Sequence, residues 1–132
     1  DEKDIREGVH HCKYLIANDY EIAQIEKKLS ITVKDLIQAG IIVITTLGEK
    51  GVLYQDQKSN ITVPSYHLKK IIDPTGAGDA FRGGFFGGVM DGKLTAECLK
   101  QGNALASFAI EKYGTANHAP TKKELSNRIE SL

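Results

Sequence analysis

A glycine-rich stretch in the second half of the chain, residues 73–88, contains the residues best suited to chemistry. Two isoleucines precede it and predict the end of a strand, and the residues that follow predict a helix beginning near Gly76. Gly76 and Gly78 permit positive φ and keep side chains away from a ligand. Because the first amide N–H groups of a helix lack intrahelical partners and lie at the positive end of its dipole, we expect phosphate to bind here.

Asp79 lies in the first turn of this predicted helix. Its carboxylate either stabilises the helix through the dipole or acts as a base beside a bound phosphate.

Two well-known phosphate loops are excluded by the residues present. A Walker A loop needs Gly-Lys-Ser/Thr, but no lysine lies between Lys70 and Lys93. The dinucleotide fingerprint Gly-x-Gly-x-x-Gly fails because Phe81 stands in place of its last glycine.

The stretch resembles the second signature of the ribokinase family, also called the phosphofructokinase-B (PfkB) family, of sugar and nucleoside kinases. The match is Asp73-x-Thr75-Gly76-Ala77-Gly78-Asp79-x-Phe81, with Gly83-Gly84-Phe85 behind it. The resemblance implies that Gly76, Ala77 and Gly78 form an anion hole for the transferred phosphoryl group and that Asp79 is the base for the acceptor hydroxyl. It also implies a monovalent-cation site for K⁺ at Asp73 and Thr75.

A second motif lies near the N-terminus, after a predicted strand over residues 14–17. Asn18 is followed three residues later by Glu21, which fits a helix capping box that satisfies two backbone N–H groups. The same pair matches the family's Asn-x-x-Glu motif, and this resemblance implies that it helps to place Mg²⁺ and phosphate, through water. The two interpretations are compatible, since one pair could cap a helix and face the water shell of the metal.

Further nucleotide contacts are implied elsewhere. The apolar run at residues 41–46 predicts a central parallel strand, and ligands in open α/β sheets bind beyond the carboxyl ends of such strands. Thr46, Gly48 and Gly51 match a family segment that lines the nucleotide, although the same glycines suit a plain turn. Asn103 corresponds to a residue that borders the adenine in the family, or is a solvated or locally bonded asparagine. Residues 114–117 resemble the small-residue turn that closes over the adenine.

Composition limits the class of protein. The 132 residues are 41% hydrophobic and 26% charged, which is typical of one globular domain with a modest core. Basic and acidic side chains balance at 17 each, so we expect no nucleic acid and no acidic membrane as partner. Cys12 and Cys98 have no metal or redox spacing, which favours the cytoplasm, although they could pair. No run reaches membrane-spanning length and no signal peptide is visible.

The remaining pattern predicts an α/β protein. We expect helices over residues 1–12, 18–29, 32–39, 76–90, 94–113 and 121–132, and strands over 14–17, 41–46, 52–54 and 61–63, the last two as an antiparallel hairpin. With the resemblance, this pattern implies a ribokinase-like three-layer α/β/α (Rossmann-like) fold with a mostly parallel sheet. The many glycines of the helix at 76–90 predict close backbone packing against the sheet or a phosphate, with Phe81, Phe85 and Val89 as the apolar stripe.

The chain does not begin with methionine, since its only one is Met90, and members of the resembled family are about twice as long. We therefore interpret residues 1–132 as the C-terminal nucleotide-binding part of a ribokinase-like kinase domain whose N-terminal substrate and lid part is absent. The resemblance implies transfer of the γ-phosphoryl of ATP to a hydroxyl of a sugar or nucleoside, and a homodimer as one state of the full-length protein. Arg82 before Gly83-Gly84 resembles the nucleoside-kinase branch of the family more than ribokinase, which implies an adenosine-like acceptor. The alternatives are a nucleotide-binding fragment without catalysis and an α/β interaction domain that binds no nucleotide.

Overall fold

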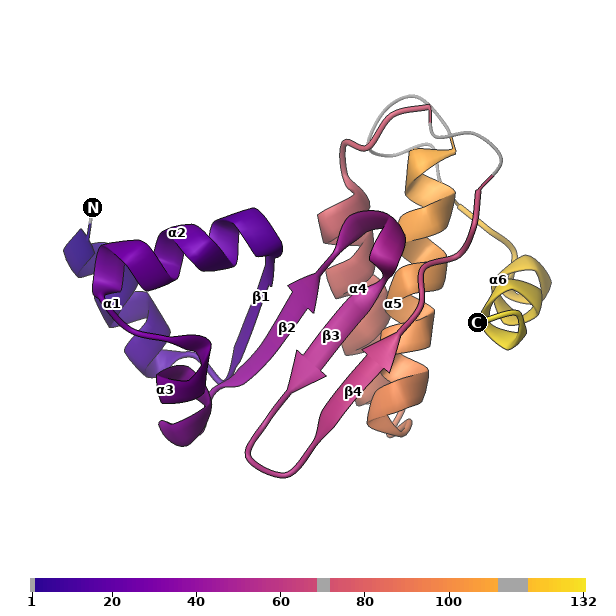
Figure 1. Cartoon of the computed structure of the whole chain (residues 1–132). Coiled ribbons are helices and arrows are strands. Elements are labelled where there is room, and N and C mark those ends of the chain that lie inside the picture. The colour runs from indigo at the N-terminus through magenta and orange to yellow at the C-terminus, as the bar shows by residue number, and fades with distance from the viewer. Residues whose placement is uncertain (1, 69–71, 112–118) are drawn as a thin grey trace. The chain divides into compact units, whose positions relative to one another are not determined.

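Residues 2–68, 72–111 and 119–132 are described by a computed structural model (Figure 1). Contacts between elements divide the chain into two compact units. The first consists of Asp1–Gly48 with Leu53–Thr62, and the second of Glu49–Val52 with Val63–Leu132. Both units contain buried apolar side chains, such as Val43 in the first and Leu99 in the second.

The first unit alternates helices with two parallel strands. Its elements are α1 (Glu2–His11), β1 (Tyr14–Asn18), α2 (Asp19–Leu29), α3 (Val33–Gln38) and β2 (Ile42–Thr46). β1 pairs with β2 in parallel, and the register places Leu15 opposite Val43 and Asn18 opposite Thr46. Val43, Ile44 and Thr45 are buried in succession along β2, as the sequence predicts for a strand covered on both faces.

A hairpin completes the sheet. β3 (Val52–Gln55) and β4 (Asn60–Val63) follow β2, and the strand order is β1-β2-β3-β4. The arrows in Figure 1 show that β3 runs opposite to β2 and β4, so the predicted antiparallel hairpin is confirmed and the sheet is mixed. Among the described strands the parallel arrangement is confined to β1 and β2. Asp56 shapes the hairpin turn, because its Oδ1 accepts hydrogen bonds from the amides of Lys58 at 2.7 Å and Ser59 at 2.6 Å.

Side-chain caps explain where several helices begin. Asn18, Thr32 and Thr121 each precede a helix, and each forms a capping box with the acidic residue three positions later. Such a box satisfies two of the N–H groups that a helix start leaves without partners. These starts were predictable from the sequence because the cap is a local interaction that needs no other part of the fold.

The second unit is built on two helices that lie side by side, α4 (Ala77–Met90) and α5 (Thr95–Ile110), followed by α6 (Lys122–Glu130) (Figure 1). Phe81 and Phe85 on α4 are each only 1% exposed, and their rings stack with centroids 6.3 Å apart. The predicted apolar stripe is therefore confirmed for these two residues.

Val89, the third residue predicted for that stripe, is 40% exposed, so this part of the prediction is wrong. Gly88 takes the buried position four residues after Gly84, where it contacts Cys98 of α5. Each residue advances a helix by about 100°, so Val89 is turned away from α5. The spacing of apolar residues could not predict the exposure of Val89, because the residue that faces α5 at this turn is a glycine, Gly88.

Glycines set the distance between α4 and α5. A Cβ at Gly84 would lie 2.7 Å from the Gln101 carbonyl oxygen, and one at Gly102 would lie 2.8 Å from the Phe81 ring. The close backbone packing predicted for the glycines of α4 is thus present at Gly84 and Gly88, but the partner is α5 and not the sheet or a phosphate. Gly83 differs, since a Cβ there would meet nothing within 4 Å.

Two further expectations concern the whole chain. Cys12 and Cys98 are free thiols, and they lie in different units. None of the helices in the described part of the chain combines the length and the apolar character that a bilayer crossing requires.

We expect Gly84→Ala to destabilise this chain by about 1–3 kcal/mol, because the added methyl forces α4 and α5 apart. Gly83→Ala is the matched control on the same helix, and we expect it to be neutral or to stabilise by about 0.4–1 kcal/mol. Urea unfolding followed by circular dichroism measures both. Equal effects of the two substitutions would show that helix packing at Gly84 is not limiting.

Candidate active site

The predicted anion loop immediately precedes α4. Gly76 is the N-cap residue of the helix and has φ +84° and ψ −5°, a left-handed conformation that favours glycine. Upstream, Asp73 Oδ1 accepts a hydrogen bond from the Thr75 amide at 2.9 Å, which closes a tight turn. The Ala77 amide donates to the Pro74 carbonyl at 3.3 Å. The loop is thus preformed as a turn that enters a helix, as the sequence predicts.

Two backbone amides of this turn are available to bind a ligand. The first helical hydrogen bond runs from the Ala80 amide to the Gly76 carbonyl at 2.9 Å. Among the residues that the structure describes, the amides of Gly78 and Asp79 have no acceptor, and no side chain caps the helix. A Cβ at Gly78 would meet only the Arg82 guanidinium, at 3.8 Å. Free amides, positive dipole and open space together suit a phosphoryl group.

The Asp79 side chain is accessible. It is 88% exposed and pairs with Arg82, which is 45% exposed, through Oδ1 and Nη1 at 2.9 Å. An exposed ion pair three residues apart on one helix contributes little to stability, about 0–1 kcal/mol. The carboxylate is therefore neither buried nor committed to structure, and it lies one residue beyond the free Gly78 amide. An exposed carboxylate beside free amides is compatible with the base role, which stays a prediction.

The start of the loop is anchored to α5. The amides of Ile72 and Asp73 both donate to the Ile110 carbonyl, at 2.8 Å and 3.3 Å. Ile110 is the last residue of α5, so its carbonyl is one of those that a helix end leaves without an intrahelical partner. Sequence reasoning missed this contact, because a backbone carbonyl carries no residue-specific signal and the two segments meet only in the folded unit.

Asn18 and Glu21 form the predicted capping box at the start of α2. Asn18 Oδ1 accepts from the Glu21 amide at 2.8 Å, and Glu21 Oε2 accepts from the Asn18 amide at 3.0 Å. Both side chains are exposed at the carboxyl end of β1, where the register places Asn18 beside Thr46. The capping interpretation is confirmed, and a role toward Mg²⁺ stays a prediction. Within the described residues, no group of three or more His, Cys, Asp or Glu side chains could hold a metal.

The segment after β2 contains a short 3₁₀ helix, η1 (Gly48–Lys50). Gly48 has φ +57°, and a Cβ there would meet nothing within 4 Å. Gly51 has φ +96°, and a Cβ there would collide with the Val63 carbonyl and lie 2.7 Å from the carbonyl carbon of Pro64. The turn interpretation therefore accounts for Gly51, whereas Gly48 leaves open space beside the backbone.

Asn103 on α5 is hydrogen-bonded to a segment that is distant in the sequence. Its Nδ2 donates to the Pro64 carbonyl at 2.8 Å and lies 3.5 Å from the Val63 carbonyl. The asparagine therefore holds α5 to the end of β4, the segment that Gly51 also approaches. The bond joins residues 39 positions apart, so it is not the local bond that the sequence suggested, and contact with adenine stays a prediction. The predicted adenine turn at residues 114–117 lies outside the described residues.

Known proteins resemble this chain in sequence and in fold. The family model described as "pfkB family carbohydrate kinase" matches residues 1–122. A nucleoside kinase of Methanocaldococcus jannaschii is 32% identical over 124 residues, which cover 94% of this chain and 41% of that protein. A ribokinase of Bacillus subtilis is 28% identical over 124 residues, which cover 94% of this chain and 42% of that protein. This chain thus spans about two fifths of the curated relatives it matches.

Solved structures share the fold. The crystal structure of the Methanocaldococcus jannaschii nucleoside kinase, described as an archaeal member of the ribokinase family, has a TM-score of 0.92 at 30% identity. That match covers 100% of this chain and 44% of that one. A Burkholderia thailandensis nucleoside kinase in complex with inosine has a TM-score of 0.93 at 28% identity, covering 99% and 44%. With the family match over most of its length, this chain belongs to the pfkB family of carbohydrate kinases.

Proposed function

We propose that this chain is the nucleotide-binding part of an ATP-dependent phosphotransferase that acts on a hydroxyl of a sugar or nucleoside. The observation that carries the proposal is the loop before α4, where two free amides and an accessible carboxylate occupy one helical turn. The names of similar proteins, nucleoside kinase and ribokinase, support the same acceptor classes. Because this chain spans about two fifths of those relatives, turnover belongs to a longer protein that includes the remainder.

Catalysis would depend on stabilising the negative charge of the transferred phosphoryl group. Phosphoryl transfer passes through a loose transition state, so catalysis depends on positioning and on neutralising the equatorial oxygens. The Gly78 and Asp79 amides would donate to those oxygens, with the helix dipole behind them. Ala77 was also predicted for the anion hole, but its amide already donates to the Pro74 carbonyl and is the weaker candidate.

Asp79 would receive the proton of the acceptor hydroxyl. Its Oδ1 contacts Arg82, which leaves Oδ2 exposed toward an incoming alcohol. Arg82 also keeps a positive charge within reach of the phosphates. The pairing of Arg82 with Asp79 does not test the adenosine-like acceptor, which is implied by resemblance alone. The nucleoside kinases among similar proteins are the better reason to favour a nucleoside.

ATP would supply the phosphoryl group, and Mg²⁺ would neutralise its phosphates. Asn18 and Glu21 keep exposed oxygen atoms that suit the water shell of Mg²⁺, a cation that usually retains several waters. We assign further nucleotide contacts to Thr46, Gly48, Gly51 and Asn103, and a K⁺ site to Asp73 and Thr75. A homodimer and a cytoplasmic location remain predictions for the full-length protein.

A second candidate function is a nucleotide-binding module without catalysis of its own. The share of the relatives that this chain covers, 41% to 44%, favours it for the isolated chain. Calorimetric binding of a non-hydrolysable ATP analogue with Mg²⁺ should succeed on the 132 residues, whereas ADP formation should be absent. An interaction domain of no nucleotide affinity would fail both measurements.

We expect Asp79→Asn, in a full-length kinase containing this chain, to lower kcat at least about 100-fold, because the amide cannot accept the hydroxyl proton. Affinity for the ATP analogue should stay within a few fold, since the backbone amides remain. Asp91→Asn is the matched control: it removes the same charge from the other end of α4 and should leave kcat unchanged. Near-normal turnover of Asp79→Asn would remove this residue from the base role.

We expect Asn18→Ala to destabilise the chain by about 0.5–2 kcal/mol through loss of the cap, and Asn18→Asp to retain its stability, because aspartate caps equally well. A role toward Mg²⁺ predicts that both substitutions shift the Mg²⁺ concentration needed for half-maximal binding of the ATP analogue. Titrations with an unchanged Mg²⁺ requirement in both variants would reduce Asn18 to a structural cap.

A further inference from the structure

Arg128, on the last helix, makes an unusually complete set of polar contacts. Its Nη1 donates to Glu111 Oε2 at 2.9 Å and to Ser107 Oγ at 2.9 Å, and its Nη2 donates to Glu111 Oε1 at 3.2 Å. The Arg128 side chain is only 13% exposed and that of Glu111 is 33% exposed. A forked, partly buried guanidinium–carboxylate pair fixes geometry far better than an exposed lysine pair could.

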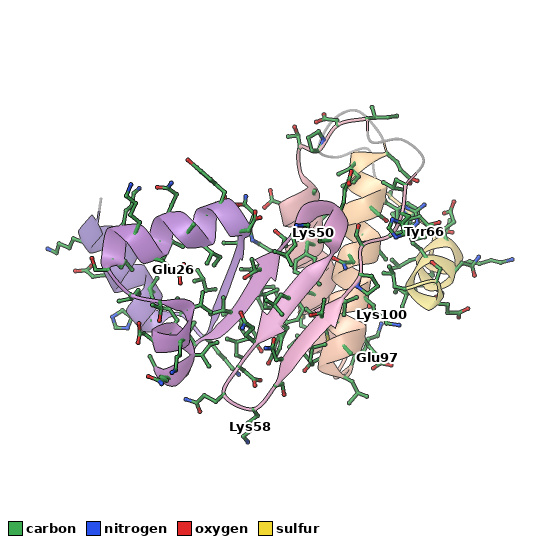
Figure 2. The ribbon with its side chains drawn as sticks, in the orientation of Figure 1. Glu26, Lys50, Lys58, Tyr66, Glu97 and Lys100 are labelled. Carbon is green, nitrogen blue, oxygen red and sulfur yellow. The ribbon has the colours of Figure 1, made fainter. Side chains whose placement is uncertain are left out.

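Aromatic rings complete the environment of this guanidinium. Its central carbon lies 3.5 Å from the ring centroid of Phe108 and 4.4 Å from that of Tyr66. Tyr66, labelled in Figure 2 beside α6, belongs to the segment that follows β4, whereas Phe108 belongs to α5. Arg128 therefore ties three segments of the second unit together through cation–π and charged contacts.

Two of those segments lead to the anion loop. Glu111 directly follows Ile110, whose carbonyl accepts the hydrogen bonds from Ile72 and Asp73 at the start of the loop. Tyr66 precedes Ile72 by six residues in the sequence. The last turn of a helix frays readily, because its final carbonyls have no intrahelical partners. A side chain that fixes Glu111 therefore fixes the acceptor on which the loop is anchored.

We propose that Arg128 is a positioning residue for the anion loop: it holds the C-terminal turn of α5 so that the Ile110 carbonyl can receive the Ile72 and Asp73 amides. Arg128 itself touches no residue of the loop in the described structure. The anchoring stands on this geometry alone, and its consequence for ATP rests on the proposed function. The competing interpretation is that Arg128 merely attaches α6 to the rest of the unit.

Amide hydrogen exchange of the isolated chain, followed by NMR, separates the two. We expect Arg128→Gln to raise exchange at Ile72 and Asp73 at least about tenfold, since local opening is set by local contacts. Amides in the middle of α4, such as that of Phe85, should change less than about twofold. Lys123→Gln removes a positive charge from the exposed side of the same helix and is the control that should change neither. Arg128→Lys should fail to restore protection, because an ammonium cannot fork to both oxygens.

Glu111→Gln guards against a variant that simply loses α6, because it weakens the same pair while leaving the Arg128 side chain on its rings. It should raise exchange at Ile72 and Asp73 in the same way. Unchanged exchange at these two amides, or an equal rise throughout α4 and α5, would overturn the proposal.

A non-hydrolysable ATP analogue with Mg²⁺ tests the consequence of the anchoring for nucleotide binding: Arg128→Gln should weaken binding of the analogue at least fivefold. If the unmodified chain binds no analogue, the proposed function fails, while the exchange data still decide the anchoring.

Discussion

The close approach of α4 and α5 is the constraint on which the second unit depends. Gly84 and Gly88 on one helix and Gly102 on the other remove the side chains that would hold two helices farther apart, and Phe81 fills the space beside Gly102. Interiors are packed at near-crystalline density, so a single methyl at such a contact has nowhere to go. Glycines inside a helix weaken it locally, and the contact between the helices offsets that loss. The position of the N-terminus of α4 relative to α5 is a consequence of this packing.

The anion loop uses both ends of that helix pair. The N-terminus of α4 provides amides that no described residue satisfies, and the C-terminus of α5 provides a carbonyl that the start of the loop satisfies. Opposite ends of two antiparallel helices meet there, one rich in free donors and one in free acceptors. Backbone amides of Ile72 and Asp73 bond to the acceptor end, whereas no described residue accepts from the Gly78 and Asp79 amides at the donor end. An open donor end at the start of a helix suits the binding of an anion.

In the first unit, the parallel strands and a helix cap fix the positions of the candidate residues. Its parallel strands place Asn18 and Thr46 side by side at their carboxyl ends, and the capping box of α2 fixes the backbone at Asn18. Asn18 and Glu21 can therefore cap the helix while both side chains stay exposed to solvent. The chain belongs to the pfkB family, and it spans about two fifths of the curated relatives that it matches.

The sequence by itself determined whatever depends on near neighbours along the chain. The capping boxes at Asn18, Thr32 and Thr121, the buried strand at Val43–Thr45 and the glycine turn into α4 all follow from local hydrogen bonds or from periodicity. The motif at Asp73–Phe81 was enough to identify the family. Tertiary structure alone decided that Val89 faces outward, that Asn103 bonds to Pro64, and that Ile110 and Arg128 support the loop. Those outcomes depend on which surfaces of distant segments meet, and a contact between residues far apart in the chain leaves no periodic trace in either segment.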